Sequence, residues 1–204
     1  IRAQTYYPLP ENNAFWTVKE FLNNRVVLFS VDGDTLVNEE SFKKVYKLYK
    51  DEDGIDTISN LHCLLRQEND QQKIFVIRTY LGEEDERLAY NFDVNYGDTI
   101  VLTAFDFNET GDTLFRVDHL TAYDSVQIYN GEYRQLYTLY SINTGFFLWV
   151  VEGVGASNSP FPNYINGYDA DFNLMTCLEV DDEYIFLNFL EMYYDPFYSC
   201  GLDI

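Results

Sequence analysis

Short apolar runs separated by turn-forming residues make up most of the chain. The runs at 26–31, 61–65 and 146–151 are rich in Val, Leu and Phe, and residues favoured in turns, above all Gly, Asn and Asp, lie between such runs. This pattern is typical of an antiparallel sandwich or barrel, whereas βαβ units need helical segments between their strands. We therefore expect an all-β fold, mainly antiparallel, built as a barrel or a two-sheet sandwich of about a dozen short strands. The length fits a single β-rich domain, residues 1–204.

Turn-forming residues predict where the hairpins lie. Asp32-Gly33 lies between two apolar runs and Asn130-Gly131 between two more, and both are strong hairpin signals because Gly and Asn accept the positive φ angles of tight turns. Residues 68–72 predict a third turn. Asp181-Asp182 predicts a closing hairpin over residues 174–188.

The tripeptide Gly-Asp-Thr occurs three times, at 33–35, 97–99 and 111–113. The residues around it do not recur at a fixed period, so we interpret it as a reused turn and not as a structural repeat. In such a turn Gly takes the positive φ, Asp accepts a hydrogen bond from nearby backbone, and Thr enters the next strand.

The segment 41–50 fits two kinds of element. Its apolar residues follow a helical period, with lysines opposite. They are Phe42, Val45, Tyr46 and Tyr49. The aromatic and β-branched content of the segment favours a strand instead. We predict a strand, with one short helix near 41–50 as the alternative.

Composition and charge narrow the classes of partner. Thirteen basic and 34 acidic side chains give a formal net charge of −21, while 47% of the residues are hydrophobic and 18% are aromatic. That apolar content indicates a folded chain. The charge repels phosphate and no stripe of Lys or Arg reverses it locally, so nucleic acid is a poor partner. No apolar run approaches the roughly 18 to 20 residues that cross a bilayer, so we expect no membrane-spanning segment.

The basic residues are distributed unevenly. All 13 lie within residues 1–134, and the 70 residues after Arg134 carry ten Asp and Glu with no Lys or Arg. A face that attracts cations is therefore expected to come from the C-terminal third of the chain.

The chain has three cysteines, so one disulfide bridge could form in three ways. Cys63 lies in an apolar, strand-like run and is most simply a buried thiol. The predicted pair is therefore Cys177–Cys200, which closes a loop of about two dozen residues. In the chain-entropy model such a bridge stabilises the fold by about 3 kcal/mol.

Two longer segments carry a resemblance. Residues 89–99 read Ala-Tyr-Asn-Phe-Asp-Val-Asn-Tyr-Gly-Asp-Thr, and residues 149–157 read Trp-Val-Val-Glu-Gly-Val-Gly-Ala-Ser. Shorter pieces accompany them in order: Tyr7-Pro8, Ala14-Phe15-Trp16, Gly33-Asp34-Thr35, residues 43–46, residues 65–67, residues 73–76 and Tyr133-Arg134. This set resembles a group of exported, uncharacterised β-rich proteins of Bacteroidetes-type bacteria. The first long segment is similar to that group's YDFNLNVGDT segment and the second to its WIEGIGS segment.

The resemblance implies a β fold and export, and it implies no established catalytic residues. Members of the group often carry a signal peptide and sometimes a C-terminal sorting domain. Since the chain opens at Ile1 without a signal pattern, we expect that an export signal has been removed. We predict a secreted or outer cell-surface protein, with attachment through an N-terminal lipid as an alternative.

Hydrolytic chemistry finds little support in the sequence. There is no G-x-S-x-G motif, and His62 and His119 both stand among strand residues, where a structural role is the simpler interpretation. With 34 acids, close carboxylate pairs are expected in any fold and do not identify a glycosidase. Glu152 is the most notable acid because it follows the run 146–151 and precedes Gly153, where a strand leaves the core. A turn carboxylate bonded to backbone is the simpler interpretation of it.

Metal sites are not expected. The acidic turn at 51–56 places three acids around Gly54, but an EF-hand loop needs Gly at its sixth position and Glu at its twelfth, where this chain has Asp56 and His62. A zinc site needs closely paired Cys or His, and the sequence has no C-x-x-C. We predict no metal and no cofactor.

The longest stretch without a strand pattern is residues 155–173, and long loops in compact domains are commonly functional. The loop interleaves aromatic rings, which can stack on sugar faces, with polar groups that can bond hydroxyls. The ligand-binding residues predicted here are Phe161, Tyr164, Asn166, Tyr168, Asp169 and Phe172. The alternative is that these rings cap one end of the barrel or sandwich.

Taken together, these patterns predict a non-catalytic binding module for a glycan or protein ligand. The alternative is a carboxylate-dependent, glycosidase-like enzyme that uses acids such as Glu152. Two carboxyl groups facing each other across a cleft at roughly 5 to 10 Å would favour the enzyme. An aromatic shelf without such a pair would favour binding.

Overall fold

Strands form most of the chain that the computed structural model describes, which is residues 6–20, 25–51, 54–79, 84–105, 113–141, 147–157, 160 and 173–187. An eight-stranded sheet has the order β13-β12-β1-β2-β3-β4-β5-β6, and a five-stranded sheet has the order β11-β10-β9-β8-β7. The strands of the first sheet are β1 (Ala14–Glu20), β2 (Arg25–Val37), β3 (Glu40–Asp51), β4 (Gly54–Glu68), β5 (Lys73–Ile77), β6 (Arg87–Asn91), β12 (Asn173–Val180) and β13 (Glu183–Leu187). Those of the second are β7 (Thr99–Phe105), β8 (Thr113–Gln127), β9 (Tyr133–Ser141), β10 (Phe147–Val151) and β11 (Gly155–Ala156).

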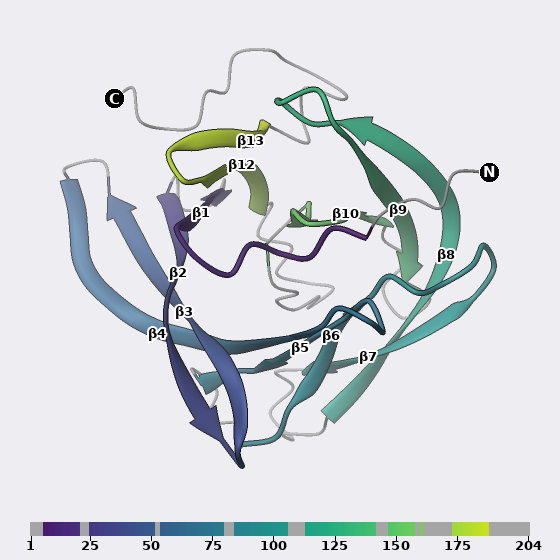
Figure 1. Ribbon diagram of the computed structural model, residues 1–204, viewed down its shortest axis with the longest axis horizontal. Helices are drawn as coiled ribbons and strands as arrows, with labels where there is room; N and C mark the ends of the chain where they lie inside the picture. Colours follow the sequence, from purple (N-terminus) through teal and green to yellow (C-terminus); the bar gives the residue numbers. More distant parts are fainter. Residues whose placement is uncertain are drawn as a thin grey trace.

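The larger sheet curls into a half-barrel, and the smaller sheet continues the ring of strands around the same interior (Figure 1). Every strand pair in the two sheets is antiparallel. One continuous hydrophobic core contains buried side chains from both sheets. The all-β, antiparallel prediction is therefore confirmed.

Alternation along the strands decides which side chains fill this core. In β1, Trp16 is fully buried while its neighbour Phe15 points outward, because successive residues of a strand face opposite sides of the sheet. Trp16 lies opposite Phe29 of β2 and Leu178 of β12, and both are buried as well. The indole N–H of Trp16 donates to the Val154 carbonyl oxygen at 2.8 Å, so the largest core side chain also ties the two sheets together.

The segment 41–50 is part of strand β3, and the alternative of a helix there is wrong. The strand pairs with β2 on one side and β4 on the other. Val45 is buried in the main core, whereas Phe42 belongs to a separate cluster with Leu64 and Ile77. Two faces of one strand thus both bury apolar residues, and this produces the i, i+3 spacing that imitates a helix. The described part of the chain contains no helix long and apolar enough to cross a membrane.

The hairpin predicted at Asp32-Gly33 is wrong. β2 continues past it to Val37, and the register with β3 shifts between Val31 and Asp34, which marks a β-bulge. Gly33 takes φ +77° at the bulge, which explains why the residue type resembled a turn. The chain reverses instead at Asn38 and Glu39, whose φ angles are 50° and 72°.

The other turns that lie in the described residues are confirmed. Gly131 (φ 87°) lies between β8 and β9, Gln72 (φ 52°) between β4 and β5, and Asp181-Asp182 (φ 52° and 62°) between β12 and β13. The Gly-Asp-Thr turn at 97–99 has each expected part. Gly97 has φ 88°, Asp98 Oδ2 accepts from the Asn95 N–H at 2.7 Å, and Thr99 begins β7.

Residues 6–13, which we call the N-terminal segment, run across the middle of the ring without pairing as a strand (Figure 1). Leu9 of this segment is buried in the main core. Gln67 of β4 holds it at two points, because its side-chain amide accepts from the Leu9 N–H at 2.9 Å and donates to the Leu9 carbonyl at 2.8 Å. Gly153 lies directly beneath the segment, and a Cβ there would come within 3.2 Å of the backbone of Tyr7 and Pro8.

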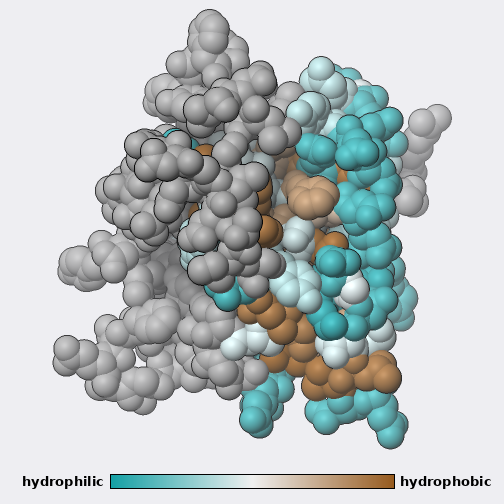
Figure 2. Space-filling model, turned by 90° about the vertical axis from the view of Figure 1, so that its left-hand side faces the viewer, coloured by the Kyte–Doolittle hydropathy of each residue, from teal (hydrophilic) through white to brown (hydrophobic). Residues whose placement is uncertain are grey.

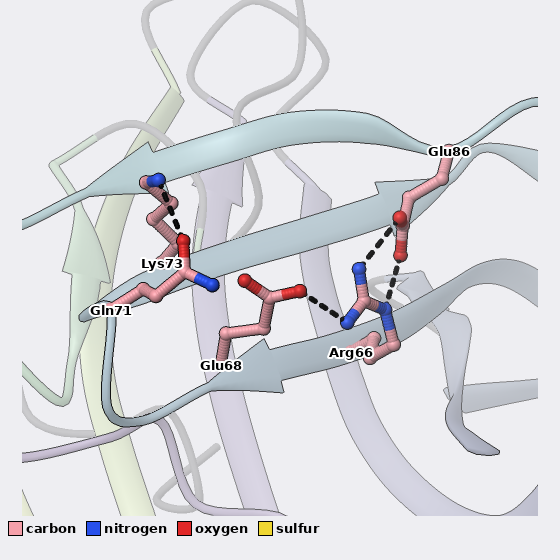
Figure 3. Close-up of polar contacts among 5 residues, drawn as sticks. All are labelled: Arg66, Glu68, Gln71, Lys73 and Glu86. Atoms are coloured by element: carbon pink, nitrogen blue, oxygen red, sulfur yellow. Dashed lines mark hydrogen bonds and ion pairs between the residues drawn. The ribbon is translucent and has the colours of Figure 1, made fainter. Parts of the chain in front are cut away.

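The outer surface of the half-barrel carries both polar and apolar features. Arg66 of β4 makes a bidentate ion pair with Glu86 at 2.6 and 2.7 Å and a further one with Glu68 at 2.7 Å (Figure 3). Its guanidinium carbon also lies 4.7 Å from the centre of the Phe75 ring. On the face seen in Figure 2, hydrophobic side chains gather toward the lower end among hydrophilic ones.

Candidate functional site: an exposed aromatic patch and a buried carboxylate

The six ligand-binding residues predicted in the loop 155–173 lie outside the described residues. They are Phe161, Tyr164, Asn166, Tyr168, Asp169 and Phe172. The start of the loop is described and is well anchored. Tyr90 of β6 donates its O–H to the Pro160 carbonyl at 2.9 Å and accepts from the Ala156 N–H at 3.0 Å. Gly155, with φ +115°, has no room for a Cβ because Pro160 backbone would lie 2.8 Å from it.

Glu152 lies in the turn between β10 and β11, as the sequence indicated, and it is only 3% exposed. Its own N–H donates to the Gln135 carbonyl at 3.0 Å. The backbone N–H groups of Tyr7 and Gln135 donate to its carboxylate, while Oε2 has no hydrogen-bond partner. Burial raises the pKa of this carboxyl, against the opposing effects of those backbone donors and of Arg134. The arrangement is that of a carboxylate bonded to backbone, which was the simpler interpretation.

Arg134 and two tyrosines complete the surroundings of Glu152. The guanidinium carbon of Arg134 stands 3.2 Å from the centre of the Tyr7 ring, and its Nη2 pairs with Glu132 at 2.7 Å. Burial lowers the pKa of Arg134, and nearby acids oppose this. Burial and the charge of Glu152 raise the pKa of the Tyr6 hydroxyl, so Tyr6 stays neutral. Because the N-terminal segment supplies Tyr6 and Tyr7, this cluster fastens that segment to the sheet.

The described residues enclose little free space. A cavity of about 10 Å³ lies between β6, β9 and β10. That is about the room that one water molecule needs, and far below the size of an organic ligand. Its lining is Ala89, Tyr90, Asn91, Phe92, Tyr137, Leu139 and Val150. This cavity is therefore too small to hold an organic ligand.

Four exposed aromatic side chains lie where the two sheets meet, and we call them the junction patch. Tyr129 and Tyr133 flank the β8–β9 turn, Tyr184 lies in β13, and Phe15 lies in β1. Their side chains are 68%, 60%, 38% and 46% exposed, respectively. Clustered exposed rings of this kind mark interaction surfaces more often than single scattered ones do.

The strand register brings the patch together. Phe15 lies opposite Glu179 of β12, and Glu179 lies opposite Tyr184 of β13, so these side chains form one row on the outer face. The Tyr129 N–H donates to the Ile185 carbonyl at 3.0 Å. This bond joins the β8–β9 turn to β13, and it places Tyr129 against the strand that carries Tyr184.

The patch has a rigid support. Phe15, Glu179 and Tyr129 each adjoin a buried residue in the chain, namely Trp16, Leu178 and Ile128, respectively. Side chains held by packed strands keep their positions better than side chains on free loops, so the row of Phe15 and Glu179 rests on a firm support.

Acidic side chains border the junction patch. Asp181 and Asp182 of the β12–β13 turn and Glu183, the first residue of β13, are all exposed. Glu179 lies within the row itself. Arg134, the last basic residue of the chain, pairs with Glu132 and with the Tyr7 ring. The patch therefore combines exposed rings with negative charge, which agrees with the expectation of a cation-attracting face from the C-terminal third.

No pattern in the sequence indicates that these four residues lie on neighbouring elements. Strand alternation requires that one of Phe15 and Trp16 face outward, but it does not say which. A usable signal was nevertheless present, because Tyr129 and Tyr133 flank a predicted turn and Tyr184 directly follows three acids. Large rings at such polar positions are unlike core residues.

The cysteines and histidines add no site. Cys63 is a free, buried thiol, as predicted, and burial raises its pKa. Cys177 is buried in β12, and Cys200 lies outside the described residues, so their pairing stays a prediction. His62 is buried with its ring 5.1 Å from that of Phe29. Within the described ranges, no group of three or more His, Cys, Asp or Glu could hold a metal ion.

The fold and the surface define an all-β protein, a curled eight-stranded half-barrel completed by a five-stranded sheet, with an acidic aromatic patch at their junction. No protein-family model, no curated protein and no solved structure matches the chain.

Proposed function

We propose that the protein is a non-catalytic binding module for a glycan or protein ligand, and that the junction patch is a binding face. The observation that carries this proposal is the row of Phe15, Glu179 and Tyr184 on the outer face, beside which the bond to Ile185 holds the exposed residue Tyr129. Exposed apolar area costs about 25 cal/mol per Å² relative to burial. A ligand that covers the exposed rings would offset this free-energy cost.

Tyrosine suits this role in particular. Its ring supplies apolar contact area and its hydroxyl keeps a hydrogen bond with water or with a ligand, which is why tyrosine is enriched at binding interfaces. Three of the four rings are tyrosines, Tyr129, Tyr133 and Tyr184. The residues predicted in the loop 155–173 are a second proposed contact region. Tyr90 anchors the start of this loop through its hydrogen bonds to Ala156 and Pro160.

We also propose that the protein acts outside the cell, secreted or attached to the outer cell surface. The resemblance to exported β-rich proteins and the predicted Cys177–Cys200 bridge support this, because structural disulfides persist in oxidising compartments. Fractionation of the producing cells, followed by protease treatment of intact cells, tests it. An intracellular, protease-protected protein would contradict it.

Ligand binding is tested with a glycan array and a peptide array probed with the wild-type protein and with a Tyr129→Ser/Tyr184→Thr variant. Binding of a ligand through the patch should be lost with the variant and kept with Tyr96→Ser, which removes an exposed tyrosine outside the patch. All three proteins should melt within a degree or two of one another, because the substituted side chains are exposed. Equal binding by all three would remove the patch from the proposal.

The glycosidase-like alternative has one supporting observation, the raised pKa of Glu152, since catalytic acids often carry such shifts. Its weakness is access, because Glu152 is 3% exposed and lies under Tyr7. A screen of chromogenic glycosides with the wild-type protein and Glu152→Gln tests it. Turnover that disappears with Glu152→Gln, in a variant that melts no lower than the wild type, would establish the alternative.

A further inference from the structure

We infer that the ligand of the junction patch is a cationic, arginine-bearing segment of a protein. This inference rests on the proposed function and names its ligand class. The patch offers aromatic faces and carboxylates side by side, and a guanidinium group can use both at once, stacking on a ring while pairing with an acid.

The charge around the patch supports a cation. Glu179 lies between Phe15 and Tyr184 in the cross-strand row. Asp182 of the β12–β13 turn and Glu183, the first residue of β13, are exposed just before Tyr184. Strands rise about 3.3 Å per residue, so these acids lie within about 10 Å of the point where Tyr129 meets β13. A cationic ligand could therefore contact rings and carboxylates at the same time, whereas an acidic glycan would be repelled by the carboxylates.

The protein already binds two of its own guanidinium groups in this way. Arg66 lies 4.7 Å from the centre of the Phe75 ring and pairs with Glu86 and Glu68. Arg134 lies 3.2 Å from the centre of the Tyr7 ring and pairs with Glu132. In both cases one guanidinium group contacts the face of an aromatic ring and pairs with a carboxylate at the same time.

Among the described residues, the strands and the turn that carry the patch hold few basic side chains. The chain has neither Arg nor Lys after Arg134, so β12 and β13 carry none; the β8–β9 turn carries none either, and β1 carries only Lys19. Arg134 follows Tyr133 in β9 and is already paired with Glu132. Lys19 is four residues along β1 from Phe15, or about 13 Å at strand spacing. Charge complementarity therefore favours a partner that supplies the cation.

The experiment measures binding of three synthetic peptides of one length, with Arg, Lys or citrulline alternating with Gly and Ser, and of a soluble neutral β-glucan. The Arg peptide should bind best, the Lys peptide more weakly, because an ammonium lacks the planar face, and the citrulline peptide least, because it is uncharged. The variant Tyr129→Ser/Tyr184→Thr, which lacks two of the rings, should bind the Arg peptide about tenfold more weakly than the wild type does. Asp182→Asn/Glu183→Gln should also weaken it and reduce its salt dependence, and Asn at 182 tolerates the positive φ found there.

Two matched controls separate recognition from general attraction to a protein of charge −21. Tyr96→Ser removes a lone exposed tyrosine, and Glu84→Gln/Asp85→Asn removes two exposed charges elsewhere. The inference would be overturned if the control variants lost as much affinity for the Arg peptide as the patch variants do. Patch-dependent binding of the β-glucan, with peptide binding independent of the patch, would overturn the inference and keep the proposed function. If binding of neither the peptides nor the β-glucan depended on the patch, both the inference and the proposed role of the patch would be rejected.

Discussion

Gln67 bonds both peptide groups of Leu9, accepting from its N–H at 2.9 Å and donating to its carbonyl at 2.8 Å. A single side chain thus replaces the strand partner that the N-terminal segment lacks. The same amide donates to Glu11 Oε1 at 3.0 Å. The segment that crosses the ring is therefore fixed by Gln67 from β4 on one side and by the Glu152 cluster on the other.

Replacing the amide should loosen this segment. Gln67→Glu keeps the acceptor for the Leu9 N–H but places a carboxylate against the Leu9 carbonyl and Glu11, so we expect a loss of about 1–3 kcal/mol in unfolding free energy. Urea denaturation measures the loss, and limited proteolysis should show faster cleavage before residue 14. Gln71→Glu is the control, because Gln71 is exposed and its side-chain oxygen accepts a hydrogen bond from Lys73 Nζ at 2.9 Å. An equal effect of both substitutions would contradict the role of Gln67.

The indole of Trp16 should contribute both packing and a hydrogen bond. Trp16→Phe leaves the buried Val154 carbonyl without its donor and opens a small void, so we expect a loss of about 2–4 kcal/mol. Phe15→Leu, one residue away on the outer face, should cost well under 1 kcal/mol. Urea midpoints of the two variants give the comparison. Similar losses would mean that the two faces of β1 are assigned incorrectly.

Glu152 should make stability depend on pH with a known sign. Its pKa in the folded protein is raised above the ordinary value of 4.5, so it favours the folded state below that value and loses this contribution as the pH rises through the raised pKa. Glu152→Gln removes the titration and keeps an acceptor for the Tyr7 N–H. We expect the variant to melt a few degrees above the wild type at neutral pH and to lose that advantage near pH 4.5.

The control for this experiment is Glu179→Gln, which removes one carboxylate from the outer face of β12. Differential scanning calorimetry between pH 4.5 and 8 follows all three proteins. If the difference between the wild type and Glu152→Gln stayed constant over this range, the carboxyl would not titrate as its burial requires.

The three cysteines should differ in their state: two are expected to form a disulfide and one to stay a protected thiol. We expect Cys177 and Cys200 to be joined and Cys63 to resist alkylation in the folded protein, because it is buried and burial raises its pKa. Mass spectrometry of a non-reduced digest should find the Cys177–Cys200 peptide pair, with Cys63 modified only after denaturation. Recovery of both C-terminal cysteines as alkylated thiols would rule out the bridge.

The loop 155–173 remains a predicted contact region. If its rings serve a ligand, Tyr164→Ala/Tyr168→Ala should abolish binding and shift the melting temperature by only a degree or two. If the rings are packing elements, the same double substitution should cost several kcal/mol, as aromatic-to-Ala changes in cores do. Thermal melting read beside a binding assay separates the two, and a steep fall in melting temperature would end the binding interpretation.

Local signals predicted much of the fold because they act within a few residues. The turns at Asn130-Gly131 and Asp181-Asp182 follow from residues that tolerate positive φ, and the strands follow from apolar alternation. The error at Asp32-Gly33 has the same origin. A glycine with positive φ serves a bulge as well as a turn, and only pairing with β3 on both sides of Gly33 decides between them.

The sequence by itself determined the class of fold, the acidic surface and the buried character of Cys63, since these depend on composition and on neighbouring residues. Only the tertiary structure decided that Glu152 would be covered by Tyr7 and that Phe15 and Tyr184 would share one row. Those relationships join residues more than a hundred positions apart, and they depend on how the sheets curl and in which register the strands pair. Curvature and register are set by the packing of the whole core, so no local pattern in the chain encodes them.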